Sequence, residues 1–168
     1  KANPVSLGHF GYDVIPTMAT FKAAKDLGFK FATDAPAELL DCATLSSGTA
    51  NVINTTMALV LPCLDKVKVL AAYTDAPLSL FPEAKLLKDQ VPGLDITLWN
   101  GLFVPKGTPQ EVKDKIAAIA KKAVLGDKAL GLAKATGAGV YWLDAKEAQA
   151  RIDADYVRAE ALMKAVTP

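Results

Sequence analysis

The sequence predicts an α/β fold with a mostly parallel, doubly wound sheet. Short β-like runs alternate with helical patterns between residues 5 and 73, and this alternation is typical of a parallel sheet covered by helices on both faces. The 168 residues are 51% apolar and 22% charged, which suits one globular unit large enough to bury a core.

The first part of the chain is expected to contain four strands and three helices. Pro16 and Pro36 each suit the first turn of a helix, where the missing N–H does no harm. Pro62 interrupts the third helix. The predicted strands cover residues 5–7, 29–32, 51–53 and 67–73, and the predicted helices cover residues 16–27, 36–45 and 57–66.

The alternation stops after residue 73. Three prolines between residues 75 and 93 predict an irregular surface segment with one helical stretch at 83–90, and residues 95–104 form the longest β-like run. Thr108 with Glu111 and Asp144 with Glu147 have the spacing of capping boxes, which predicts two helices that begin there. A short helix is expected at 128–135, a short strand at 139–142, and a final helix with a buried stripe at Ala148, Ile152, Tyr156, Ala159 and Leu162.

Composition excludes several classes of protein. The net charge of +1 carries no concentrated positive patch, so nucleic acid and anionic membranes are not expected partners. The longest apolar stretch, residues 57–64, is too short to span a bilayer. Two cysteines and one histidine cannot supply a zinc cluster, and no other metal or cofactor is expected.

The most informative local feature is the loop from Gly8 to Asp13, between a predicted strand and a predicted helix. Backbone N–H groups at such a helix N-terminus attract anions, but the loop has no nucleotide-binding fingerprint. The alternative is a tight turn that Asp13 caps. Its carboxylate would compete with a bound anion for the same N–H groups.

His9 is the single histidine, and two roles remain open for it. A catalytic role would need a carboxylate or an activated nucleophile, whereas lining the loop or binding a ligand needs no partner, and we favour this second role. Thr55 and Thr56 follow a predicted strand, which is where open α/β sheets place ligand groups.

Cys42 and Cys63 lie on consecutive predicted helices, 21 positions apart. An oxidising compartment would permit a disulfide between them. We expect two free, buried thiols instead, because helices on opposite faces of a sheet could not meet.

The order of these signatures resembles the Bug family, the solute-binding receptors of tripartite tricarboxylate transporters. Val5-Ser6-Leu7-Gly8 with its glycine loop, Gly48 before residues 51–53 and the run 67–73 contribute to the likeness. Its most specific part is Trp99-Asn100-Gly101-Leu102-Phe103-Val104-Pro105-Lys106-Gly107-Thr108-Pro109. The likeness covers the whole chain, as the later part of a longer receptor, and the start at Lys1-Ala2-Asn3-Pro4 is interpreted as a cut within it.

The resemblance implies a fold, a function and a compartment. Residues 1–97 would be the second lobe of a type II periplasmic-binding-protein-like fold, and residues 98–168 would recross and return toward the first lobe. Such receptors are periplasmic, are not enzymes, and deliver a small organic carboxylate to the membrane components of the transporter. The ligand-binding positions carried over are His9, Phe10, Gly11, Tyr12, Asp13, Thr55 and Thr56.

Two departures from the family pattern concern the ligand. Thr33-Asp34-Ala35-Pro36-Ala37 lacks the aromatic residue and the glycine usual there, and Asp13 adds a charge to the loop. Asp13 could recognise an amino group or a hydroxyl of the ligand. Other functions remain open: a small hydrolase or lyase that uses His9 and Asp13, or a co-receptor for a sensor kinase.

The apolar stripe at Val112, Ile116 and Ile119 needs a partner surface. We expect this segment to fold back on residues 1–97 or to associate with a second copy of the chain.

Overall fold

A three-stranded parallel sheet organises the first part of the computed structural model, which describes residues 4–166. The strand order is β2-β1-β3, and the strands cover Ser6–His9 (β1), Thr33–Pro36 (β2) and Val52–Ile53 (β3). Because all pairs are parallel, the carboxyl ends of the strands lie at the same edge. The proposed cut at residues 1–3 lies outside the described residues.

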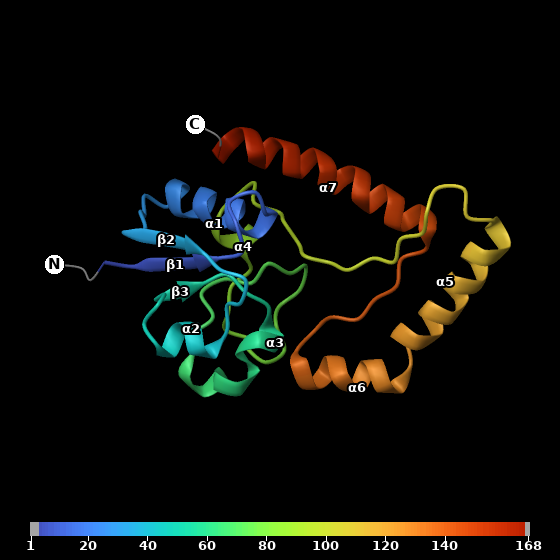
Figure 1. Ribbon diagram of the computed structural model, residues 1–168, viewed down its shortest axis with the longest axis horizontal. Coiled ribbons are helices and arrows are strands. Elements are labelled where there is room, and N and C mark those ends of the chain that lie inside the picture. Colours follow the sequence, from blue (N-terminus) through green and yellow to red (C-terminus); the bar gives the residue numbers. More distant parts are fainter. Residues whose placement is uncertain (1–3, 167–168) are drawn as a thin grey trace.

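Helical segments lie on both faces of this sheet, so the α/β, doubly wound prediction is confirmed (Figure 1). On one face, the His9 ring contacts Phe21 of α1 (Ile15–Asp26) edge to face, at 5.7 Å between centroids. On the other face, Gly8 lies against Leu40, directly before α2 (Cys42–Ser46). A side chain at Gly8 would bring its Cβ within 2.9 Å of Leu40 Cδ2.

The remaining helices carry the chain away from the sheet and back. The long helix α7 returns beside α1, whereas α5 and α6 lie at the side far from the sheet (Figure 1). Within residues 4–166, no helix combines the length and the apolar character needed to cross a membrane. Their bounds are Met57–Val60 (α3), a 3-10 helix at Leu61–Lys66, Leu87–Gln90 (α4), Gln110–Val124 (α5), Asp127–Thr136 (α6) and Ala145–Val166 (α7).

The main apolar core lies between α1, α4 and α7, beside the sheet. Leu94 and Ala19 are among its most buried members, and Leu162 is the one residue of α7 that is fully inside it. The predicted α7 stripe is therefore only partly correct, since Tyr156 is 72% exposed. The cluster consists of Met18, Ala19, Ala23, Leu87, Val91, Leu94 and Leu162.

The second strand and the second helix are both displaced from their predicted positions. The strand occupies Thr33–Pro36 rather than residues 29–32, and Pro36 ends it instead of opening a helix. Proline is tolerated there because β2 is an edge strand and needs hydrogen bonds on one side only. The helix begins later, where Asp41 accepts hydrogen bonds from the Ala43 and Thr44 amides.

Three predicted strands are absent from the described residues. Residues 67–73 form only a single bridge, between Ala72 and Leu86. Residues 95–104 and 139–142 run without strand pairing. A β-like sequence forms a strand only where another extended segment lies beside it. The proline-rich residues 75–93 supply no such extended segment.

The two predicted capping boxes differ in outcome. Asp144 and Glu147 exchange the expected hydrogen bonds at the start of α7, at 2.8 and 2.9 Å. Thr108 instead turns its hydroxyl to the Pro105 carbonyl, and Pro109 occupies the N-cap of α5 without a side-chain cap. The capping box predicted for Thr108 and Glu111 is therefore wrong, because the Thr108 hydroxyl closes the preceding turn.

Cys42 and Cys63 form a disulfide, with Cα atoms 6.0 Å apart. The expectation of two free thiols is therefore wrong. It assumed that both cysteines lie on regular helices on opposite faces of the sheet. Cys63 instead lies in the 3-10 segment after α3, on a locally non-helical backbone, and this segment comes within bonding distance of α2.

Candidate functional site

The carboxyl ends of β1 and β3 bring the two predicted ligand segments to one edge of the sheet. Gly8 pairs with Ile53, and the Asn54 amide donates to the Gly8 carbonyl at 3.1 Å. The loop 10–14 and residues 54–56 therefore begin at adjacent positions. Open α/β sheets bind ligands at this edge. We call the loop 10–14 the β1 loop.

The β1 loop leads into the N-terminus of α1. Val14 is the N-cap, and no side chain caps the helix, so the capping role considered for Asp13 is not observed. Pro16 has no N–H, which leaves the amides of Ile15 and Thr17 as first-turn donors without intrahelical acceptors. Phe10, Tyr12 and Asp13 are exposed around this helix end.

His9 is fully buried, and both of its ring nitrogens have partners in the protein. The Gly11 amide donates to Nδ1 at 3.2 Å, and Nε2 lies 3.3 Å from Asp34 Oδ1. The Tyr12 hydroxyl donates to the same carboxylate oxygen at 2.6 Å. His9 thus lines the β1 loop, and it pairs with Asp34 rather than with Asp13.

Asp34 also acts on Tyr12. The hydrogen bond to the Asp34 carboxylate raises the pKa of the Tyr12 phenol, with smaller contributions from desolvation and from the carboxylate charge. Tyr12 therefore remains a hydrogen-bond donor at neutral pH. We refer to His9, Gly11, Tyr12 and Asp34 as the His9 cluster.

Thr55 and Thr56 occupy different environments beside the β1 loop. The Thr55 hydroxyl donates to the Leu40 carbonyl at 2.6 Å, so its proton is already engaged. Thr56 is exposed and is the N-cap of α3, where it makes no side-chain cap. Of the two, Thr56 offers the more accessible hydroxyl.

Sequence reasoning missed the polar residues that support this edge of the sheet. The side-chain amide Nδ2 of Asn54 donates to Thr20 Oγ1 at 2.7 Å and to the Pro16 carbonyl at 3.2 Å. Thr20 in turn shares a hydrogen bond of 2.7 Å with the Tyr73 hydroxyl. Burial raises the pKa of Tyr73 despite hydrogen bonds from Thr20 and Asn54, which lower it. Asn54 directly follows a predicted strand, and that position was the available signal.

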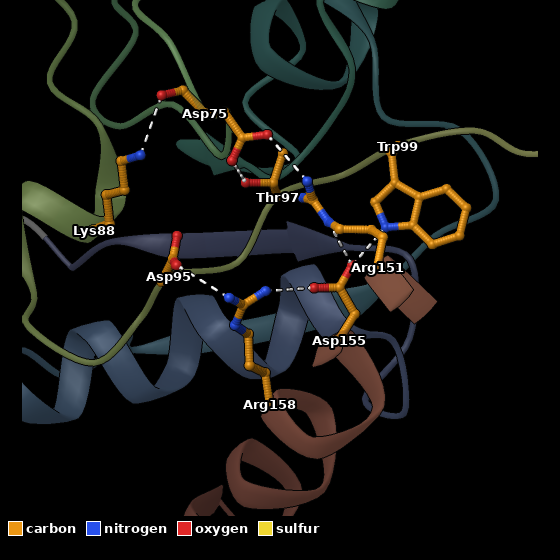
Figure 2. Close-up of polar contacts among 8 residues, drawn as sticks. All are labelled: Asp75, Lys88, Asp95, Thr97, Trp99, Arg151, Asp155 and Arg158. Atoms are coloured by element: carbon orange, nitrogen blue, oxygen red, sulfur yellow. Dashed lines mark hydrogen bonds and ion pairs between the residues drawn. The ribbon is translucent and has the colours of Figure 1, made fainter. Parts of the chain in front are cut away.

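A second polar cluster, the α7 junction, ties α7 to the segment that leaves the sheet. It consists of Asp75, Lys88, Asp95, Thr97, Trp99, Arg151, Asp155 and Arg158 (Figure 2). Asp155 accepts hydrogen bonds from Trp99 Nε1 at 2.6 Å, from Arg151 at 3.0 Å and from Arg158 at 2.8 Å.

Asp75 and Asp95 join the same cluster from the chain segment opposite α7. Thr97 donates to Asp75 at 2.6 Å, and Arg151 reaches Asp75 at 3.4 Å, while Arg158 lies 3.6 Å from Asp95. Each arginine therefore bridges α7 to that segment (Figure 2).

The donors of the α7 junction shift its carboxyl groups. Burial raises the pKa of Asp155, but hydrogen bonds from Trp99, Arg151 and Arg158 outweigh this effect and leave the pKa below its usual value. The Thr97 hydroxyl is the largest cause of a lowered pKa at Asp75. Both carboxylates are thus charged at neutral pH.

A cavity of about 430 Å³ lies beside the α7 junction. Ile15 borders it from the start of α1, Phe103 from the segment before α5, and Ile152 and Tyr156 from α7. Its lining is mainly apolar. Among residues 4–166, no group of three or more His, Cys, Asp or Glu side chains could hold a metal ion.

Comparison with known proteins supports this geometry at the level of the fold. A scan against family models gives no match, and no curated protein matches the sequence. A crystal structure of a TctC solute-binding protein from Polaromonas, without ligand, is similar with a TM-score of 0.69 and 24% identity. The two chains share a fold.

The alignment with the TctC protein covers 98% of this chain and 58% of the Polaromonas chain. The chain therefore spans less than two thirds of the length of the structure that it matches.

Proposed function

We propose that the chain is part of a periplasmic solute-binding receptor that captures a small organic carboxylate for a tripartite transporter, without catalysing a reaction. The observation that carries this proposal is the β1 loop, placed at the carboxyl edge of a parallel sheet and leading into an α1 N-terminus without a side-chain cap. Such a helix end favours negative charge. The fold shared with a TctC solute-binding protein supports the same function.

The ligand-binding residues of this proposal are those that remain accessible at the edge. Phe10, Tyr12, Asp13 and Thr56 are exposed, whereas His9, Gly11 and Thr55 donate or accept hydrogen bonds within the protein. We assign the first group to ligand contact and the second group to shaping the site. Burial of His9 also disfavours the hydrolase or lyase alternative, which needs an accessible base.

The disulfide supports the proposed compartment. Bonds such as that between Cys42 and Cys63 persist in oxidising surroundings, including the bacterial periplasm, and are rare in the cytosol.

The domain assignment remains part of the proposal. Residues 1–97 would form one lobe, and residues 98–168 would cross back toward another lobe that completes the ligand site. The exposed apolar residues of α5, among them Val112, Ile116 and Ile119, support a further packing surface there. Self-association of this chain would bury the same surface and so compete with packing against the other lobe.

The proposal is tested by titrating the protein with succinate, citrate, glutamate and glucose while following backbone amides by NMR. Carboxylates should move the amides of Phe10, Tyr12, Asp13 and Ile15 and leave those of α6 unchanged, and they should be recovered unaltered. Binding of glucose alone, or turnover of a carboxylate, would reject the proposed function.

A further inference from the structure

The hydrogen bonds of His9 define where its proton lies. Gly11 N–H can only donate, so Nδ1, at 3.2 Å, must carry a lone pair. The proton of the neutral ring then belongs on Nε2, 3.3 Å from the Asp34 carboxylate. This is the tautomer that a carboxylate partner selects.

The same ring holds two consecutive residues of the β1 loop. Gly11 is attached through its amide and has φ +140°, a conformation open to glycine. Tyr12 is attached through Asp34, at 2.6 Å, and through an edge contact with the His9 ring at 4.6 Å between centroids. The attachment of Gly11 therefore depends on an acceptor at Nδ1 of His9.

We infer that His9 and Asp34 are positioning residues that hold the β1 loop in its binding conformation only while His9 is neutral. A second proton must go to Nδ1 and would point a donor at the Gly11 N–H, which breaks that hydrogen bond. Asp34 retains the charged ring in place, so the protein stays folded while Gly11 is released from the ring and the β1 loop loses this attachment.

The groups around the His9 ring are consistent with a change on protonation that is confined to the β1 loop. Asp34 faces it from β2, the Tyr12 phenol faces it from the loop, and α1 presents the uncharged Phe21 ring. The Asp13 carboxylate lies near Gly11, since a Cβ built there would be 3.1 Å from Asp13 Oδ1. A loop freed by acid can therefore rearrange near the residues assigned to ligand contact.

This inference rests on the proposed function only where it calls the loop a ligand loop, so its first test needs no ligand. The ring nitrogens of His9 and the amide of Gly11 are followed by ¹⁵N NMR between pH 8 and 5. We expect the Nε2–H tautomer at neutral pH and a Gly11 amide shift with the same midpoint as the ring.

Two substitutions separate the two hydrogen bonds of the ring. His9→Asn places an oxygen near the Nδ1 position and cannot titrate, so the loop should hold at every pH. His9→Gln reaches toward Asp34 but offers no acceptor to Gly11, so the loop should be released at every pH. Asp26→Asn, whose partner is Lys22 on α1, is the control and should keep the wild-type transition.

Succinate serves as the carboxylate probe for the consequence. The ratio of the succinate affinity of the wild type to that of His9→Asn should fall about threefold to tenfold from pH 8 to 5. The ratio is used because the titration of succinate itself affects both proteins equally. A ring protonated on Nδ1 at neutral pH, a ring that stays neutral to pH 5, or a Gly11 amide indifferent to ring titration would overturn the inference. If the loop follows His9 but succinate binds at no pH, the positioning role stands and the proposed function falls.

Discussion

Three hydrogen bonds of the α7 junction converge on the carboxylate of Asp155. Three donors, from Trp99, Arg151 and Arg158, meet its two oxygens. Asp155→Asn should lower the free energy of unfolding by about 1–2 kcal/mol, since charge-assisted hydrogen bonds are lost or weakened. Urea unfolding of the variant measures this, with Asp127→Asn on α6 as the control. An unchanged midpoint would show that α7 is held by apolar packing alone.

The lowered pKa values at the α7 junction predict how stability depends on pH. A carboxyl group with a lowered pKa in the folded state stabilises the protein above its unfolded pKa, and this contribution is lost as the pH falls through the folded value. Asp155 and Asp75 both have this sign. The stability difference between wild type and Asp155→Asn should therefore shrink below about pH 4, in urea unfolding at a series of pH values. A difference that grows in acid would contradict the assignment.

Asp13 is predicted to select among ligands rather than to support the fold. It is exposed and caps no helix, so Asp13→Asn should leave the thermal midpoint nearly unchanged. Removal of its charge should favour succinate over glutamate, because repulsion of a carboxylate falls and attraction of an amino group is lost. NMR titrations with the two ligands give the ratio, and an unaltered ratio would exclude Asp13 from recognition.

The sequence indicates only part of the candidate site. The β1 loop is contiguous, so its glycines and its place before a helix are visible directly. Asp34 lies 25 positions from His9, in a stretch predicted to precede a helix, and nothing local links the two. Residues that meet only because β1 and β2 pair could not be found without knowing the register.

At the scale of elements, Gly8 determines how closely the sheet and the α2 segment approach. A Cβ there would lie 2.9 Å from Leu40 Cδ2 and 3.3 Å from Ala50 and Ile53. Gly8→Ala should therefore destabilise the protein by about 1–3 kcal/mol through overpacking. Gly131→Ala within α6, where a Cβ meets nothing within 4 Å, should stabilise by about 0.5–1 kcal/mol. Equal effects of the two substitutions in urea unfolding would contradict this packing.

The disulfide joins α2 to the 3-10 segment and closes a loop of 21 positions. Cys42→Ala with Cys63→Ala should cost about 3 kcal/mol in the chain-entropy model. Thiol titration of the unfolded, unreduced wild type should find no free thiol, and two free thiols would reject the bridge.

Helices and strands differ in how far the sequence predicts them. Helical periodicity and the Asp144 cap are local signals, so the sequence predicts the positions of α1, α5, α6 and α7 within a few residues. The strands at residues 67–73 and 95–104 were not formed, because strand formation depends on a neighbour elsewhere in the chain. Pro36 shows the same dependence on distant residues. A strand tolerates this proline only because β2 lies at the edge of the sheet.

At the scale of the whole molecule, α7 folds back on α1 whereas α5 keeps an exposed apolar surface. Ile119 is 63% exposed and Val112 is 44% exposed. We expect this chain to self-associate through that surface as its concentration rises. Ile119→Lys should reduce the association measured by sedimentation velocity, while Lys115→Gln on the same helix should not. A monomer at all concentrations would favour intramolecular shielding of the surface.

The proposal that another lobe completes the ligand site also sets the affinity expected for this chain. One helix N-terminus contributes about 0.3–1 kcal/mol to anion binding, whereas micromolar affinity needs about 8 kcal/mol. Carboxylates should therefore bind this chain far more weakly than with micromolar affinity. Micromolar binding by a monomer would show that residues 1–168 already form a complete site.

The most direct test of the central claim is a map of the amides that respond to succinate. The account predicts weak, saturable shifts centred on the β1 loop and the first turn of α1, with Thr56 beside them. Citrate should compete and glucose should not. Saturable shifts confined to α5 and α6, or no saturable shift with any carboxylate, would contradict the assignment of this sheet edge as a carboxylate site.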